Sequence, residues 1–364
     1  MTSELFIGLM SGTSLDGVDA VVLEISDRHN QILQTGFEPY PLALRDRLLA
    51  LHHPSHDELH QTALVGNELA GLYAQAVNDV LTRAGIDHQR ISAIGCHGQT
   101  IRHRPETGYT LQIGNAALLA ELTGITVVSD FRSRDIAAGG QGAPLVPAFH
   151  QAVFGSAQRD RVILNIGGIA NVTTLPGQGQ IRGFDTGPGN LLMDAWAQRH
   201  LGKHYDADGT WAMTGQLVEP LLASLLAEPF FDLPPPKSTG RDLFNLQWLA
   251  SRLGPQHAAA DVQRTLLELS TRSIAQAILR FCATADEIYV CGGGAHNTAL
   301  LQGLRDQLPG SAILLTDALG IGADWVEAAA FAWLAHRALQ RAPGNLPEVT
   351  GAKGERILGA VYAS

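Results

Sequence analysis

The stretch that decides the fold is GLMSGTSLDGVDA, residues 8–20, in which an apolar run breaks at a polar turn and then resumes. Residues 5–9 and 18–25 predict two antiparallel strands joined by this turn. The chain repeats the design at residues 162–175, where VILNI and IANVTTL flank a Gly-Gly turn. Two similar hairpins, one opening each half of the chain, indicate a duplicated architecture.

After each hairpin the apolar pattern alternates between helices and short buried strands. Helical periodicity is found at residues 57–84, 191–201, 262–283 and 297–308, and buried strands are predicted at residues 91–96, 125–129 and 287–291. This alternation is typical of α/β lobes. A charged, small-residue stretch before the second hairpin predicts the boundary, giving lobes of residues 1–150 and 151–364.

The size and composition of the chain agree with two lobes. Its 364 residues, 45% of them hydrophobic, exceed what one apolar core usually organises. The net charge of -10 and the absence of a Lys/Arg cluster argue against nucleic acid as a partner. The three cysteines show no CxxC pair, and no apolar run approaches a signal or membrane-spanning length, so we expect a cytoplasmic protein.

The turn of the first hairpin is a candidate phosphate-binding loop. Small residues in such a turn let backbone N–H groups and hydroxyls surround phosphate oxygens. An ordinary hairpin turn would use the same residue types. Asp16 and Asp19 would face a magnesium ion or its water shell. The candidate residues of the loop are Gly12, Thr13, Ser14, Leu15, Asp16, Gly17, Val18 and Asp19.

Two further glycine turns extend the predicted nucleotide site. Gly167 and Gly168 form the turn of the second hairpin, although a glycine bulge in a buried sheet would look the same. Gly292, Gly293 and Gly294 follow a predicted strand and precede a helix. A Rossmann fold could also explain this cluster, but the GxGxxG spacing is incomplete. The sequence contains neither GxxxxGK[ST] nor the protein-kinase motifs, so the hairpins remain the candidate phosphate grip.

Asp185, in GFDTGPGN at residues 183–190, is the candidate catalytic residue. The pattern predicts that it stands at the end of a strand, before a glycine-proline turn and a helix. A carboxylate in that place can take a proton from an attacking hydroxyl or water. It could equally stabilise its own turn at the helix entry.

Polar residues after two predicted strands, at 96–103 and 129–147, are candidate contacts to a sugar or a carboxylate, because ligands of α/β folds bind at strand ends. Structural capping is an equal alternative for each. Arg132 is the favoured partner of a carboxylate, since guanidinium can donate paired hydrogen bonds. The candidates are His97, Gln99, Thr100, Asp130, Arg132 and Asp135.

The helix predicted at residues 320–339 holds a further candidate. Asp324 is expected to cap it, and Glu327 falls in its first turn. The helix dipole alone would explain a glutamate there, and so would a sugar facing it.

Two other segments stay open. His52, His56 and His60 have helical ligand spacing, but Pro54 interrupts the helix, and a solvated loop is the favoured interpretation over a metal site. LPPPKSTGRD, residues 233–242, must be extended or looped because of its prolines. It could be a mobile loop beside the substrate or a plain surface connection.

Six motifs together carry a family resemblance. They occur in the order GLMSGTSLDGVDA, HGQT, NIGGIANVT, FDTGPGN, CGGGAHN and GADWVEAAAFA and span nearly the whole chain. They resemble those of the anhydro-N-acetylmuramic acid kinase family. The resemblance implies a two-lobed actin-like ATPase (ribonuclease H-like) fold with duplicated lobes and ATP in the interlobe cleft.

The resemblance also implies a reaction. Water would open the 1,6-anhydro ring of 1,6-anhydro-N-acetylmuramic acid while ATP, with Mg²⁺, phosphorylates O6, a step in peptidoglycan recycling. Asp185 would be the general base, Asp16 would serve the metal, and residues 292–294 would flank adenosine. The family further implies a homodimer. The residues expected to contact the sugar are His97, Gln99, Thr100, Arg132 and Glu327.

Two alternatives compete with this interpretation. The first is an ordinary sugar kinase of the same fold that phosphorylates an existing hydroxyl without hydrolysis. The second is a nucleotide-switched binding protein. A base at Asp185 argues against the second alternative.

Overall fold

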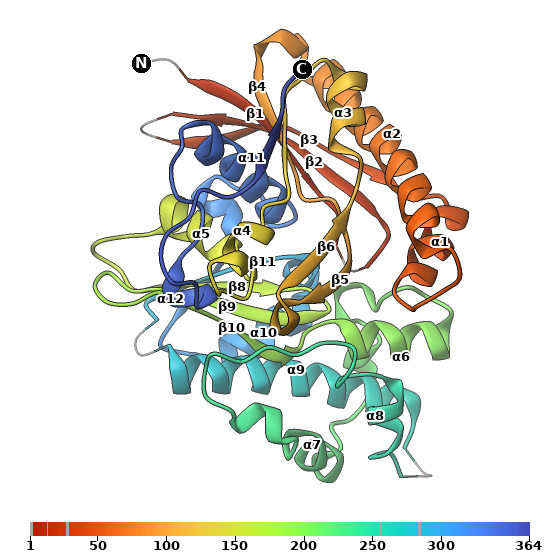
Figure 1. Ribbon diagram of the computed structural model, residues 1–364. Coiled ribbons are helices and arrows are strands. Elements are labelled where there is room, and N and C mark those ends of the chain that lie inside the picture. The colour runs from red at the N-terminus through yellow and green to blue at the C-terminus, as the bar shows by residue number, and fades with distance from the viewer. Residues whose placement is uncertain (1–2, 13, 27–28, 255–256, 283–284) are drawn as a thin grey trace. The chain divides into compact units, whose positions relative to one another are not determined.

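The structure is a computed structural model that describes residues 3–12, 14–26, 29–254, 257–282 and 285–364. It divides into two compact units. Unit 1 comprises Met1–Val153 and Trp325–Ser364, and unit 2 comprises Phe154–Asp324. Figure 1 shows the strands and helices of each unit.

A mixed sheet forms the centre of unit 1. Its strand order is β13-β7-β4-β1-β2-β3. β1 pairs antiparallel with β2 and parallel with β4, so the predicted first hairpin is confirmed. The strands are β1 (Glu4–Met10), β2 (Gly17–Ile25), β3 (Asn30–Pro39), β4 (Ile91–Cys96), β7 (Val127–Ser129) and β13 (Ala360–Tyr362).

The sheet of unit 2 repeats this topology. Its order is β10-β9-β8-β11-β12, which matches β3-β2-β1-β4-β7 place by place. β8 and β9 form the second predicted hairpin, and β11 joins β8 in parallel as β4 joins β1. The duplicated lobes expected of an actin-like fold are therefore present. The strands are β8 (Arg161–Ile166), β9 (Ile169–Leu175), β10 (Arg182–Pro188), β11 (Glu287–Cys291) and β12 (Ala312–Leu315).

Helices cover both faces of the unit 1 sheet because side chains alternate along β1. Leu5, Ile7 and Leu9 enter a core with apolar residues of α1, α2 and α3, whereas Gly8 meets α11. A separate short hairpin, β5 (Gln99–Arg104) with β6 (Tyr109–Ile113), follows β4. The helices are α1 (Leu42–Leu51), α2 (Glu58–Ala84), α3 (Ala116–Thr123), α4 (Ser133–Ala137), α5 (Val146–Phe154), α11 (Val326–Leu339) and α12 (Pro347–Thr350).

In unit 2, one apolar core joins residues of α6, α7, α8 and α9. Short 3-10 turns, η5 (Pro229–Asp232) and η6 (Gly293–His296), interrupt the connections. α6 spans the residues predicted from the sequence. The helices are α6 (Leu191–Leu201), α7 (Glu219–Leu226), α8 (Leu246–Ala250), α9 (Ala259–Phe281) and α10 (Thr298–Gln307).

The C-terminal segment departs from the predicted lobes. Residues after Asp324 were assigned to the second lobe, but they group with unit 1. α11 packs on β1 and β4, and β13 pairs antiparallel with β7. α11 covers a face of the unit 1 sheet, and β13 pairs with its edge strand β7. Local sequence patterns do not encode such long-range contacts. Among the described residues no helix combines the length and apolarity that a membrane span requires.

The start of α11 also differs from the prediction. The helix begins at Val326, one residue later than an Asp324 cap predicts, and no side chain caps it. The Asp324 carboxylate instead pairs with His296 Nε2 at 2.9 Å. Asp324 is therefore not a helix cap.

Candidate active site

The first hairpin turn in unit 1 is held by its own side chains and by the loop after β4. Ser14 Oγ donates to Asp16 Oδ1 at 2.6 Å, and Gln99 Nε2 donates to Gly12 O at 3.1 Å. Leu15 adopts a left-handed φ of 57°. The structure thus brings the predicted phosphate turn and the HGQT motif together. Thr13, another predicted contact, lies outside the described residues.

Three of the turn's predicted contacts have little exposed surface. Leu15 and Val18 are buried in the core of unit 1, and Gly17 is the first residue of β2. Only the backbone of Leu15 or Val18 could reach a nucleotide. Asp16 is exposed, and Asp19 lies in β2 beside the turn.

His97, Arg132 and Glu327 form a polar cluster within unit 1. Arg132 Nη2 and Nε lie 2.9 and 3.2 Å from His97 Nε2. His97 is buried and packs on the ring of Phe331 with centroids 4.7 Å apart. Burial and the Arg132 charge hold the pKa of His97 well below its usual value. The imidazole is therefore neutral, and because Nε2 accepts from Arg132, its proton is on Nδ1.

Arg132 keeps hydrogen-bonding capacity for a ligand. Burial lowers the pKa of Arg132 to about 10, opposed by the charges of Glu327 and Asp135, so the guanidinium stays charged at neutral pH. Nη1 donates to Gly142 O at 2.8 Å. Guanidinium has five N–H groups, and described residues accept from three of them, which leaves one on each terminal nitrogen for a two-point grip on a carboxylate.

Glu327 lies beside this group on the first turn of α11. Burial raises the pKa of its carboxyl, and the Arg132 charge opposes that rise. Gln99 is fully buried, and no described residue donates a hydrogen bond to its Oε1. Thr100 Oγ1 accepts from Gln112 Nε2 at 3.0 Å on the β5–β6 hairpin.

The two aspartates proposed near Arg132 serve the local fold. Asp135 is fully buried, and its Oδ1 accepts from Asn345 Nδ2 and Thr350 Oγ1, both at 2.7 Å. Its Oδ2 accepts from Gly142 N at 2.8 Å. Asp130 accepts from Ser133 Oγ at 2.5 Å. Asp135 therefore ties the C-terminal segment to unit 1 and does not face a ligand.

The second hairpin turn and the CGGG turn pack together in unit 2. A Cβ added to Gly292 would lie 2.3 Å from Asn165 Oδ1, and one added to Gly294 would lie 2.3 Å from Ile166 Cγ2. Gly293 is exposed, with Asn190 Nδ2 as the nearest group at 3.9 Å from its Cβ position. Gly293 therefore presents exposed backbone beside two packed turns, which a nucleotide can approach closely.

Both hairpin glycines are bound by the start of α6. Asn190 N donates to Gly167 O at 2.8 Å, and Gly189 N and Leu191 N donate to Gly168 O at 2.9 and 3.1 Å. FDTGPGN and NIGGIANV are therefore one structural unit. Asn190 was not among the predicted site residues, although its motif was.

Asp185 stands within β10 and not at the end of a strand, because the strand continues to Pro188. Its Oδ2 accepts hydrogen bonds from Ser238 Oγ at 3.0 Å and Thr239 N at 2.9 Å. None of the described residues donates to Oδ1. Burial raises the pKa of Asp185, and the two hydrogen bonds and the Lys237 charge oppose the rise.

Lys237, Ser238 and Thr239 are candidate site residues that the sequence interpretation did not single out. They belong to the segment whose role stayed open between a substrate-side loop and a surface connection. The structure places this segment against Asp185, through Ser238 Oγ and Thr239 N at its carboxylate and Lys237 O at its backbone N–H. The signal was faint: the prolines before Lys237 indicated only that the segment is not helical.

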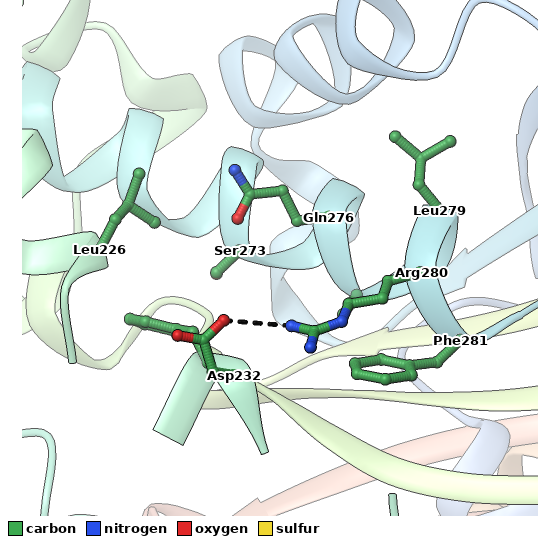
Figure 2. Close-up of a pocket in the computed structure, with 9 residues that line it drawn as sticks. Leu226, Asp232, Ser273, Gln276, Leu279, Arg280 and Phe281 are labelled. Carbon is green, nitrogen blue, oxygen red and sulfur yellow. Dashed lines mark hydrogen bonds and ion pairs between the residues drawn. The ribbon is translucent and has the colours of Figure 1, made fainter. Parts of the chain in front are cut away.

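A separate pocket of about 340 Å³ lies between η5 and α9 (Figure 2). Figure 2 shows the Asp232–Arg280 ion pair, with N and O 3.1 Å apart, beside Phe281. None of the predicted site residues lines this pocket, so we do not place the substrate there. In the part of the chain that the structure describes, no three His, Cys, Asp or Glu side chains form a group suited to a metal.

Comparisons with known proteins identify the family. The family model for anhydro-N-acetylmuramic acid kinase matches residues 4–364. The anhydro-N-acetylmuramic acid kinase of Nitrosospira multiformis is 57% identical over 364 residues, covering 100% of both chains. That of Nitrosomonas europaea is 56% identical over 359 residues, covering 98% of this chain and 99% of the relative.

Solved structures are less similar. Component A of (R)-2-hydroxyglutaryl-CoA dehydratase from Acidaminococcus fermentans has a TM-score of 0.48 at 13% identity, covering 91% of this chain and 96% of that one. These values are too low to carry an argument. The family match over almost the whole length, together with relatives at 56% and 57% identity, is decisive. The chain belongs to the anhydro-N-acetylmuramic acid kinase family.

Proposed function

We propose that this protein uses ATP to phosphorylate 1,6-anhydro-N-acetylmuramic acid at O6 while water opens the anhydro ring. The products are N-acetylmuramic acid 6-phosphate and ADP. The observation that carries the proposal is the Asp185 carboxylate, with Oδ2 held by two donors and Oδ1 open, in a chain of this family.

The proposed reaction is a coupled hydrolysis and transfer. Asp185 accepts a proton from water as the water oxygen bonds to the anomeric carbon, and the bond from that carbon to O6 breaks. O6 then bonds to the γ-phosphorus, and ADP leaves with the electrons of the broken phosphoanhydride bond. Positioning and charge stabilisation supply most of the catalysis in phosphoryl transfer.

Each predicted contact has a proposed role. The turn at residues 12–19 and the glycines at 167–168 and 292–294 bind ATP. Arg132 binds the lactyl carboxylate of the sugar with its two remaining N–H groups, and Glu327 holds the sugar beside it. His97, which is neutral and accepts a hydrogen bond from Arg132, contacts the sugar together with Gln99 and Thr100.

A magnesium ion bound here would be coordinated mainly by phosphate oxygens and water, and the residues of the phosphate turn suit such an ion. Asp16 is an exposed carboxylate on the phosphate turn, and such ions need only one or two protein carboxylates beside a nucleotide. Bound Mg²⁺ would neutralise phosphate charge. We also infer from the family that the protein is cytoplasmic and forms a homodimer. Light scattering on the purified protein measures its molar mass, which decides whether it is a dimer.

The function is tested by incubating the protein with ATP, Mg²⁺ and the anhydro sugar in heavy-oxygen water. We expect one heavy oxygen in the anomeric hydroxyl of the phosphorylated product. Product without the label, or phosphorylation of reducing N-acetylmuramic acid alone, would indicate an ordinary sugar kinase instead. Asp185→Asn should lower kcat roughly 100-fold or more while leaving both KM values near normal. Near-normal turnover in this variant would remove Asp185 from the mechanism.

A further inference from the structure

Asp185 lies on the outer edge of the unit 2 sheet. β10 is the last strand in the order, paired only with β9 in that sheet. The open edge is covered at this residue by the segment after the prolines. Asp185 N donates to Lys237 O at 3.1 Å, and Thr239 N donates back to Asp185 Oδ2 at 2.9 Å. One short segment thus holds both the backbone and the carboxylate of Asp185.

The strand itself does not determine where Asp185 points. The register between β10 and β9 shifts between Asp185 and Gly187, which marks a bulge. Bulges re-aim side chains and are common beside active sites. Thr186, the residue between them, is buried and donates to Ala170 O at 3.1 Å. The hydrogen bonds to the Asp185 carboxylate come from outside the sheet, from Ser238 Oγ and Thr239 N.

The segment has an anchor of its own. Lys237 is buried, and its Nζ donates to the carbonyls of Phe230 and Phe231, both at 3.2 Å. The ammonium also lies 4.6 Å from the centroid of the Phe230 ring. The Phe231 ring packs on Gly187, where an added Cβ would lie 2.6 Å from Cε1. The turn that fixes Lys237 thus rests on the same strand that carries Asp185.

We propose that Ser238 is a positioning residue for the catalytic step: its hydroxyl and the neighbouring Thr239 N–H fix Asp185 Oδ2 so that Oδ1 faces the attacking water. This inference rests on the proposed role of Asp185 as the base. Ser238 is exposed and is not part of the core, so replacing it perturbs the site without threatening the fold. Its hydroxyl donates to Asp185 Oδ2 at 3.0 Å, and this hydrogen bond opposes the burial that raises the pKa of Asp185.

The test is the pH dependence of kcat/KM in Ser238→Ala. Losing a hydrogen bond to a carboxylate raises its pKa, so the acid limb should move up by about one pH unit. At pH values on that limb, kcat/KM should fall about tenfold, with the KM for ATP unchanged. Ser238→Thr keeps a hydroxyl and should restore the wild-type profile.

Ser251→Ala is the matched control. Ser251 is also exposed, and its Oγ donates to Trp248 O at 2.7 Å and not to a carboxylate. We expect a wild-type profile. An equal shift in Ser251→Ala, or an unmoved acid limb in Ser238→Ala, would overturn the proposal.

The Asp185→Asn variant separates the positioning role of Ser238 from the proposed role of Asp185 as the base. Inactive Asp185→Asn together with an unmoved Ser238→Ala profile refutes only the role of Ser238. Active Asp185→Asn refutes the base itself and, with it, the need to position one. An inactive Asp185→Asn with a shifted, threonine-rescued Ser238→Ala profile supports both.

Discussion

Asp194, on α6, shows how one residue can make stability depend on pH. Burial raises its pKa from 3.8 to about 7; Arg241 opposes this rise, and Asp206 adds to it. Asp206 accepts from Trp211 N and Ala212 N at 2.8 and 2.9 Å. These two N–H groups bind Asp206, whose charge adds to the rise, and not Asp194.

The stability contribution of Asp194 follows from this raised pKa. The folded state binds a proton that the unfolded state releases, so stability is full below about 3.8 and falls as pH rises to about 7. Asp194→Asn removes this loss. The raised pKa sets an upper limit of about 4 kcal/mol, and we expect about 2 kcal/mol because the side chain is partly exposed.

Urea unfolding at pH 5 and pH 8 measures the effect. Asp194→Asn should exceed the wild type in stability at pH 8 and keep roughly a third of that advantage at pH 5. Asp306→Asn, an exposed aspartate on α10, is the control and should match the wild type at both. An equal advantage at both pH values would contradict the assigned cause.

At the scale of elements, two paired glycines allow α11 to lie on the unit 1 sheet. Gly8 on β1 and Gly95 on β4 are register partners. A Cβ at Gly8 would lie 1.8 Å from Ala328 O, and one at Gly95 would lie 1.9 Å from Phe331 O. The obstacle is helix backbone, which cannot rotate away as a side chain can.

Gly95→Ala should therefore destabilise the protein by about 3 kcal/mol or more, the upper end for overpacking a core. Gly71→Ala on α2 is the matched control, since nothing lies within 4 Å of the added Cβ. That change should stabilise the protein by about 0.5 to 1 kcal/mol, because alanine favours a helix. Equilibrium unfolding in urea measures both signs, and a neutral Gly95→Ala would mean that α11 lies farther from the sheet.

At the scale of the whole molecule, the chain enters unit 1 twice. Trp325–Ser364 contributes α11 and β13 to a unit begun by Met1–Val153. Asp135 receives hydrogen bonds from Asn345 and Thr350, and Gln141 N donates to Thr350 O at 2.8 Å. Unit 1 is therefore incomplete without Trp325–Ser364.

A stop after Asp324 tests this dependence. Limited proteolysis with mass mapping should show rapid cleavage within Met1–Val153, which loses the helix on its sheet, and protection of Phe154–Asp324. Removing only residues 363–364, which are exposed and follow β13, should change nothing. Protection of the first segment in the truncated chain would contradict the role of α11.

The sequence by itself determined both hairpins, the duplicated α/β lobes, the family and the glycine turns, because tight turns and apolar periodicity are local properties. It also singled out Asp185 and Arg132 by residue type and position. Only the tertiary structure decided that the C-terminal segment returns to unit 1 and that Lys237–Thr239 cover the edge of β10 at Asp185. Both depend on contacts between residues far apart in the chain. Each forms where a sheet edge or an apolar face would otherwise be uncovered, and the residues of that edge or face do not specify which segment covers it.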